Sequence, residues 1–301
     1  MDKTQKTVSY SQYVMWATCP WQWKLAYIDR HKSEEPSIHL VFGSAIHSVV
    51  QYWLQLAFGK GAKRANYFDL DEMFKDEMVK EFKSRTLIQK DGTKIFPCDK
   101  IILQEFYLDG IAILKYMRDH YNKIFKIEGW ELLGVEIPLK LEVRKNLNYK
   151  AYLDIVFKET KTGEIKIVDL KTSTKGWNKW TKADTKKINQ ILLYKRYYSE
   201  IYKVPEEMIT VQFVILKRKL YENCDFPQPR ISLFEPSDGT PSVNRAVKSF
   251  TEFLDSCFDG DGNFNSKVKA TPSESNCRFC PFSENKSLCT QSYYLGDSTN
   301  V

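Results

Sequence analysis

Apolar side chains recur at intervals of three and four residues over several stretches in the first part of the chain, and this is the period of a helix. The longest stretch begins near Ile38 and places Gly59 at its end, where helices commonly stop. Ser9 or Ser11 can cap an earlier helix, and Pro20 marks a break or a new first turn. We therefore expect helices in residues 9–21, 38–58, 70–87 and 101–125.

The pattern changes to that of strands after residue 125. Three runs rich in β-forming residues are separated by turn residues, Lys145 with Asn146 and Thr162 with Gly163. They predict an antiparallel meander of three strands. Helical spacing then returns and is followed by a fourth apolar strand and one more amphipathic helix. The predicted strands are residues 130–143, 149–158, 164–171 and 208–217, and the helices are residues 182–202 and 242–258.

No stretch rich in Pro or Gly clearly divides the chain. The order of the elements from residue 38 onwards favours an α/β fold in one domain, with helical additions before the sheet. We expect a single domain over residues 1–301. Its parts are a helical N-terminal part in residues 1–125 that carries Cys19 and His47, a core in residues 126–220, and a helix with a loop-like, cysteine-rich tail in residues 221–301.

The composition narrows the class of protein. Of 301 residues, 43% are hydrophobic, which supplies enough apolar surface for a core and excludes global disorder. No run approaches roughly 20 uncharged apolar residues, and the opening residues lack the apolar stretch of a signal peptide. We expect a soluble, cytoplasmic protein with no membrane partner. The net charge of +7 suits a polyanion partner without proving one.

Two acidic residues and a lysine fall on neighbouring predicted strands. The alternation of side chains places Asp154 opposite Leu153 and Ile155, and it places Asp169 and Lys171 on one face of the next strand. Two close carboxylates repel each other unless a cation lies between them, and such oxygen ligands suit Mg²⁺ or Mn²⁺. For an isolated D-x-K sequence, an edge-strand ion pair of Asp169 with Lys171 and a turn cap by Asp154 would be the likelier explanation.

The order of short motifs along the chain resembles that of RecB-type nucleases in the PD-(D/E)XK superfamily. The resemblance covers residues 9–289. It implies a central mixed sheet flanked by helices, with an N-terminal helical addition. The motifs are Gly43-Ser44-Ala45-Ile46-His47, Glu136, Tyr152-Leu153-Asp154, Val168-Asp169-Leu170-Lys171, and Gln190 with Tyr194.

The resemblance implies a role for each motif. Lys171 lies beside the attacking water, and Glu136 supports catalysis from the preceding strand. Gln190 and Tyr194 share one helical face, where Gln190 is expected to contact the scissile region. For Tyr194, core packing is an equal alternative to substrate contact, and a lone histidine on an apolar helix is by default a core residue. The implied ligands of Mg²⁺ or Mn²⁺ are His47, Asp154, Asp169 and the backbone carbonyl of Leu170.

The odd count of 7 cysteines argues against a complete disulfide framework. Cys277, Cys280 and Cys289 lie close together in the tail, while Cys19 lies far from them. This set resembles the iron–sulfur exonucleases of AddB type and of CRISPR adaptation, in which one early and three late cysteines hold a [4Fe–4S] cluster. The gap before Cys289 is longer than is usual in those families. Zn²⁺ or buried free thiols are the alternatives.

A basic and aromatic segment follows the strand of Asp169. Lysines neutralise phosphates and tryptophans stack on unpaired bases, so a run that mixes both suits single-stranded DNA. Clustered lysines are otherwise usually a solvated charged face. Because this run follows the acidic cluster directly, we expect DNA to contact Lys175, Trp177, Lys179, Trp180 and Lys182.

These features and the resemblance predict a metal-dependent DNA exonuclease that hydrolyses phosphodiester bonds and prefers single-stranded DNA or DNA ends. The resemblance implies a role in recombination, repair or DNA processing. The chain has no G-x-x-x-x-G-K-[ST] motif, so any unwinding would come from a helicase or recombination protein as a partner. The alternatives are a non-catalytic DNA-binding or assembly module, and a structure-selective endonuclease of the same superfamily.

Overall fold

The computed structural model describes residues 6–31, 36–265 and 267–295. Their contacts group the chain into two compact units. We call Glu35–Ile137 with Tyr152–Val243 the central unit, and Met1–Glu34 with Pro138–Ala151 and Asn244–Val301 the end unit. That residues 1–301 form a single nuclease domain stays a prediction.

The first half of the central unit is helical, as the apolar spacing predicts. The predicted end of the long helix at Gly59 is wrong, because the helix runs through this residue and stops at Gly61. Gly61 has a φ of 89°, a conformation that glycine adopts at little steric cost. The helices are α3 (Ile38–Lys60), α4 (Ala62–Ala65), α5 (Leu70–Arg85) and α6 (Lys100–Phe125), and a hairpin of β2 (Leu87–Ile88) and β3 (Lys94–Ile95) separates the last two.

The main sheet has six strands in the order β1-β5-β6-β7-β8, with β4 pairing with β5 outside this path. The strands β5 and β6 are antiparallel, whereas β6 and β7 are parallel, which confirms a mixed sheet. The helices α7 (Lys179–Ala183) and α8 (Thr185–Tyr202) form the crossover that parallel strands need. The strands are β1 (Lys6–Val8), β4 (Trp130–Arg144), β5 (Leu147–Glu159), β6 (Ile165–Ser173), β7 (Ile209–Lys217) and β8 (Ile231–Phe234).

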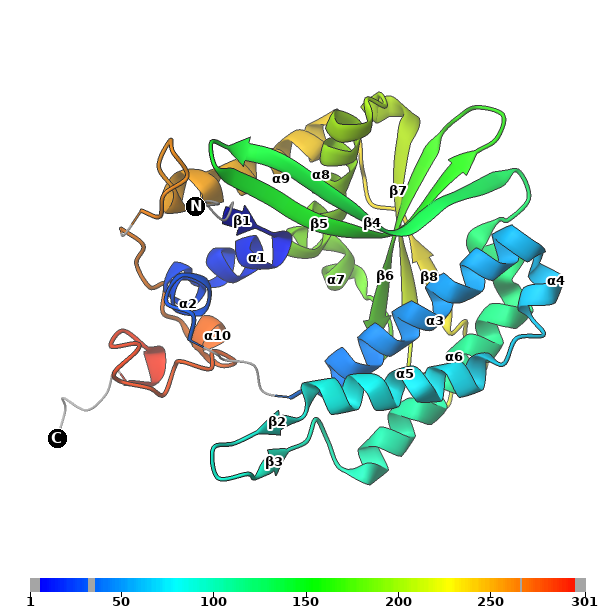
Figure 1. Ribbon diagram of the computed structural model, residues 1–301, viewed down its shortest axis with the longest axis horizontal. Helices are drawn as coiled ribbons and strands as arrows, with labels where there is room; N and C mark the ends of the chain where they lie inside the picture. The colour runs from blue at the N-terminus through cyan, green and yellow to red at the C-terminus, as the bar shows by residue number, and fades with distance from the viewer. Residues whose placement is uncertain (1–5, 32–35, 266, 296–301) are drawn as a thin grey trace. The chain divides into compact units, whose positions relative to one another are not determined.

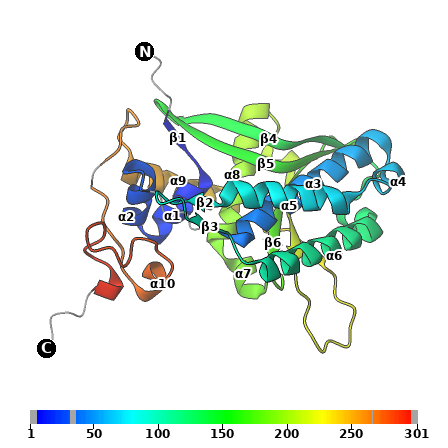
Figure 2. The ribbon, with the colours of Figure 1, turned by 60° about the horizontal axis from the view of Figure 1, so that its bottom comes forward.

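Helices flank both faces of β6 in the central unit (Figures 1 and 2). On one face, Val168 and Leu170 are buried in a core shared with α3, α5 and α6. Burial of each such side chain stabilises the fold by about 1.5 to 3 kcal/mol. On the other face, Asp169 and Lys171 point towards α8, from which Gln190 contacts Lys171. Alternation along one strand thus separates the core from a polar site.

The end unit combines the two ends of the described chain. Ser9 caps α1 (Tyr10–Thr18), and Pro20 begins α2 (Pro20–Trp23), as expected from the sequence. A π-helical turn (Lys24–Ile28) follows. The buried Trp23 packs edge-on against Phe253 of α9 (Thr240–Cys257), with ring centroids 5.4 Å apart. The strand β1 runs parallel to β5 with Val8 opposite Tyr149, and α10 (Glu274–Cys277) lies in the tail.

Across the part of the chain that the structure describes, no helix has the length and apolar character needed to cross a bilayer.

Candidate active site

Strands β5 and β6 separate beyond the residue pair Ile155 and Val168, the last pair of their ladder. Asp154, the next residue of β5, lies at this point. Its Oδ2 accepts a hydrogen bond of 2.7 Å from the main-chain nitrogen of Leu170. The side chain thereby replaces a main-chain partner that the diverging strand no longer supplies. The separation of the strands therefore holds the carboxylate of Asp154 between them.

Asp169 is almost fully buried, with 2% of its surface exposed. Lys171 Nζ lies 2.8 Å from its Oδ2, but the angles leave that oxygen without an aligned hydrogen bond. Burial raises the pKa of Asp169 to about 6, against the opposing charge of Lys171, and the negative charge of Asp154 contributes to the rise. Burial likewise raises the pKa of Asp154 to about 6. Both groups ionise reluctantly without more positive charge nearby.

His47 approaches the same carboxylates from α3. Its Nδ1 lies 3.8 Å from Oδ2 of Asp154. Burial and, to a smaller extent, the positive charge of Lys171 lower the pKa of His47 to about 4. The imidazole is therefore neutral at physiological pH, the form that binds metal ions.

Lys171 begins a chain of polar contacts that leads to α8. Its Nζ donates to Oε1 of Gln190 over 3.0 Å, and Nε2 of Gln190 donates to Oη of Tyr194 over 2.7 Å. Burial disfavours the charged form of Lys171, but the carboxylates of Asp169 and Asp154 outweigh it and raise its pKa. Burial also raises the pKa of Tyr194. The lysine stays a cation and the tyrosine stays a neutral phenol.

Glu136 lies in β4 with a φ of 51°, which is unusual for a residue other than glycine. Its Oε1 accepts a 2.7 Å hydrogen bond from Nε2 of Gln51, which also donates to the main-chain oxygen of Asp154 over 3.1 Å. The sequence reasoning missed Gln51. The signal that points to it is a polar residue one helical turn after His47 on the buried face of α3.

The donor types at this site fit a divalent metal ion. Two carboxylates of raised pKa, a neutral imidazole and a buried oxygen without an aligned hydrogen bond favour a hard cation. Within the described residues, however, no group of three or more His, Cys, Asp or Glu side chains is arranged to hold an ion. The ligand set of His47, Asp154, Asp169 and the Leu170 carbonyl therefore stays a prediction.

A family model describing the PD-(D/E)XK nuclease superfamily matches residues 7–286. The chain belongs to this superfamily. Membership implies nuclease activity that depends on a divalent metal such as Mg²⁺ or Mn²⁺. The mixed sheet flanked by helices is consistent with the fold of these nucleases.

No curated protein matches the chain. Among solved structures, the chain is similar to the crystal structure of SSO0001, with 11% sequence identity and a TM-score of 0.30. The match covers 91% of this chain and 93% of the other.

The basic and aromatic segment of this nuclease lies after β6, and its residues differ in their surroundings. Trp177 packs against Phe213, with ring centroids 4.9 Å apart, so its ring serves packing in the central unit. Trp180, by contrast, is 73% exposed, and Nζ of Lys179 lies 4.9 Å from the centre of its ring. Lys182 lies over the ring of Phe234, and Lys175 lies over that of Tyr221.

The four cysteines predicted to share a cluster come together in the end unit. Cys19, Cys277, Cys280 and Cys289 line one cavity of about 20 Å³. Burial raises the pKa of Cys280, and the other three thiols raise it further. Trp21, two residues after Cys19, donates from Nε1 to the main-chain oxygen of Leu288 over 2.9 Å, beside Cys289. The fold thus brings thiols from distant parts of the sequence to one cavity, and their donor type fits a thiolate-bound metal. Within the described residues, these side chains are not arranged to hold an ion, so the cluster stays a prediction.

Proposed function

We propose that the protein is a RecB-type DNA exonuclease that acts on single-stranded DNA or on DNA ends. The observation that carries this proposal is the convergence of Asp154, Asp169 and Lys171 where β5 and β6 separate. Two acids that ionise reluctantly and one lysine kept charged are the groups that a metal-dependent phosphodiester hydrolase needs.

Each group has a proposed role in that reaction. The residues that would hold the ion are His47, Asp154, Asp169 and Leu170 through its carbonyl. When bound, a divalent ion supplies a water of lowered pKa and positive charge beside the phosphate. Glu136 supports this set through Gln51, which contacts both Glu136 and the main chain of Asp154.

Lys171 is proposed to stabilise the attacking oxygen or the charge that develops on the phosphate. Gln190 holds its ammonium in place, because the amide oxygen accepts from Nζ. The hydroxyl oxygen of Tyr194 accepts from Gln190, so its proton is left for another acceptor, and a phosphate oxygen is the one we propose. In this arrangement, Gln190 and Tyr194 orient the lysine and contact the scissile phosphate.

The preference for unpaired strands rests on the segment after β6. The exposed ring of Trp180 and the nearby Lys179 offer a stacking surface and a positive charge. Lys175 and Lys182 add charge for neighbouring phosphates. We place the activity in recombination, repair or DNA processing, where a helicase or recombination partner would supply unpaired ends.

The test uses linear and circular single-stranded DNA of the same sequence, incubated with Mg²⁺ or Mn²⁺. We expect the labelled linear strand to be shortened, the circle to stay intact, and EDTA to stop the reaction while binding persists. Cleavage of the circle would show an endonuclease. Binding of both DNAs with no cleavage under any metal condition would show a non-catalytic module and overturn the proposal.

Variants of the acidic residues test whether cleavage depends on the candidate active site. Asp154→Asn and Asp169→Asn are expected to abolish cleavage and to leave DNA binding. Asp225→Asn, which changes an exposed carboxylate of the central unit, is the matched control and is expected to change neither. Retention of nuclease activity by both Asp154→Asn and Asp169→Asn would contradict the assignment of these two acids to the active site.

We further propose that Cys19, Cys277, Cys280 and Cys289 hold a [4Fe–4S] cluster, with Zn²⁺ as the alternative metal. The support is that all four line one cavity. Such a metal would stabilise the end unit by joining segments distant in sequence.

Anaerobic purification followed by absorbance at about 400 nm and metal analysis tests the cluster. Iron and sulfide are expected in wild-type protein and in Cys224→Ser, which changes an exposed thiol outside the set. Cys280→Ser is expected to lose them. Stoichiometric zinc without iron would show that the four cysteines bind zinc and not an iron–sulfur cluster. Protein without either metal would overturn both the cluster and the zinc site.

A further inference from the structure

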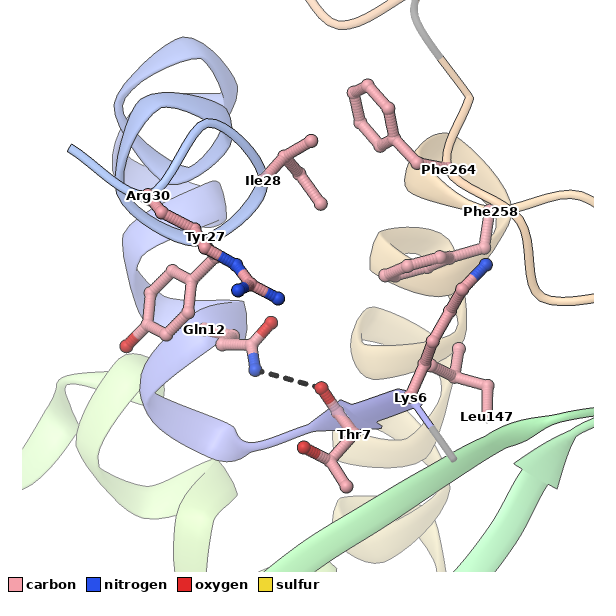
Figure 3. A pocket seen from close by; sticks show the side chains of 9 residues that line it. All are labelled: Lys6, Thr7, Gln12, Tyr27, Ile28, Arg30, Leu147, Phe258 and Phe264. Atoms are coloured by element: carbon pink, nitrogen blue, oxygen red, sulfur yellow. Dashed lines mark hydrogen bonds between the residues drawn. The ribbon is translucent and has the colours of Figure 1, made fainter. Parts of the chain in front are cut away.

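The end unit contains a cavity of about 660 Å³, which is within the size range of ligand sites. One wall comes from the segment around the π-helical turn, with Tyr27 and Arg30, and the facing wall comes from Phe258 and Phe264 (Figure 3). All of its lining residues belong to the end unit, whereas the candidate active site belongs to the central unit. They are Lys6, Thr7, Gln12, Tyr27, Ile28, Arg30, Leu147, Phe258 and Phe264.

The lining carries two positive charges and no carboxylate. Lys6 is held by the main-chain oxygen of Gly262 at 3.2 Å and by Oδ1 of Asn263 at 3.0 Å. Among the residues that the structure describes, Arg30 has no carboxylate within ion-pair distance, and its guanidinium points into the space between the walls (Figure 3). A cavity with this charge balance favours an anionic ligand.

The walls also present rings, which a simple anion does not need. Phe264 is held by Trp23, with ring centroids 5.9 Å apart, and Phe258 lies 5.8 Å from the same indole. Tyr27, on the other wall, is 39% exposed, and its ring points away from Phe264 (Figure 3). The rings of Phe258 and Phe264 suit a flat aromatic group, and the guanidinium of Arg30 on the facing wall suits a phosphate.

The side chain of Gln12, which also lines this cavity, has a fixed orientation. Its Nε2 donates to the main-chain oxygen of Thr7 over 3.1 Å (Figure 3). Its Oε1 accepts from Nε1 of Trp23 over 3.2 Å. One amide hydrogen remains for a ligand. A polar group held in this way between charged and aromatic walls is characteristic of a small-molecule or nucleotide site.

We propose that this cavity binds one nucleotide of a single DNA strand. The base lies against the ring of Phe264, and the guanidinium of Arg30 binds the adjoining phosphate, with Lys6 adding positive charge. The choice of DNA rests on the proposed nuclease function. The site itself is separate from that function, because none of its residues takes part in hydrolysis.

Photocrosslinking tests the position of the base. An oligothymidine with one 5-iododeoxyuridine is irradiated with the full chain in EDTA, and crosslinked peptides are identified by mass spectrometry. We expect a crosslink on the peptide that contains Phe264. Phe264→Tyr keeps an aromatic ring and is expected to keep the crosslink, whereas Phe264→Ala is expected to lose most of it.

The affinity for the same oligothymidine tests the phosphate contact. Arg30→Ala is expected to weaken binding about threefold to tenfold more than Arg64→Ala, which removes another exposed arginine, from the central unit. The slope of log affinity against log salt concentration should fall by about 0.7 in Arg30→Ala. Equal effects of the two substitutions, with no crosslink in the cavity, would overturn this inference.

The two proposals fail in different ways. Crosslinks confined to the segment around Trp180, together with metal-dependent shortening of linear DNA, would reject the cavity and leave the nuclease. Crosslinks to Phe264 in a protein that never cleaves DNA would reject the nuclease and leave the cavity as a DNA site.

Discussion

The side chain of Gln51 donates one hydrogen bond to Oε1 of Glu136 over 2.7 Å and another to the main-chain oxygen of Asp154 over 3.1 Å. One buried amide therefore connects the residue of unusual φ in β4 to the strand that carries an acid of the candidate site. Backbone conformations of this kind persist where surrounding contacts hold them. Gln51 is thus a positioning residue, since it acts through Glu136 and Asp154.

Replacement of Gln51 by leucine tests this role. The substitution removes the donor and leaves the carboxylate of Glu136 without its partner, so we expect nuclease activity to fall about 10-fold to 100-fold, as for other residues that orient metal ligands. The affinity for Mn²⁺ should fall with it. Activity and Mn²⁺ titrations measure both effects.

Gln212→Leu is the matched control. Gln212 is also buried in the central unit, and its Nε2 donates to a glutamate, Glu235, over 2.6 Å. We expect a similar loss of about 1 to 3 kcal/mol of stability and no selective loss of activity. Equal losses of activity in the two variants would reduce Gln51 to a structural residue.

Lys171→Ala is expected to lower kcat by about 100-fold or more, because the only described cation beside Asp169 would be gone when charge develops in the reaction. DNA affinity should change little, because other lysines bind the phosphates. Lys195→Ala is the control, since Lys195 is a buried lysine paired with Asp238 at 3.0 Å. It should lower stability, and a matching drop in its kcat would argue against a special role for Lys171.

The helices and the polar face of β6 follow from the sequence. The apolar spacing predicts α3, α5 and α6, and simple alternation predicts that Asp169 and Lys171 share a face. These features depend on short-range periodicity, so their prediction requires no knowledge of contacts between distant segments.

Other features of the site depend on pairing between distant segments. The separation of β5 from β6 next to Asp154 and the φ of Glu136 leave no mark in hydrophobic spacing. The strand β1 has three residues, too few to show a period, and it is stabilised by pairing with β5. Gln51 escaped notice because a single polar residue on an apolar face has many explanations.

The pH dependence of metal binding follows from the pKa values of the two acids. Folding raises the pKa of Asp154 and of Asp169 from 3.8 to about 6, so the folded protein holds these protons more tightly than the unfolded chain. Their contribution to stability is full below pH 3.8 and is lost as the pH rises through about 6. His47, with its pKa lowered from 6.5 to about 4, contributes oppositely: its stability is present above pH 6.5 and is lost as the pH falls through about 4.

A metal ion must displace the carboxyl protons, so we expect the rise in Tm caused by Mn²⁺ to be small at about pH 5 and to level off above about pH 7. Thermal unfolding with and without Mn²⁺ at several pH values measures this. Asp169→Asn should show little rise at any pH. A rise of equal size at every pH in the wild-type protein would contradict the assignment of these acids as ligands.

Trp180→Ala is expected to weaken binding of single-stranded DNA about fivefold or more, because stacking on an exposed indole contributes about 1 to 3 kcal/mol per base. Its Tm should not change, because the ring is 73% exposed. Tyr67→Ala removes another exposed aromatic ring of the central unit, 91% exposed, and serves as the control. Equal affinities of Trp180→Ala and Tyr67→Ala for single-stranded DNA would show that no base stacks on Trp180.

The composition of the end unit also bears on how the protein is made. Trp23 is buried by Phe253 and Phe258, so its ring leaves the ribosome long before the rings that will cover it. Until α9 has been synthesised, α1 and α2 expose large aromatic surfaces and have no core of their own. A pause in translation before α9 would therefore leave an aggregation-prone nascent chain. At that stage chaperones, and not the native fold, would keep the early helices from aggregating.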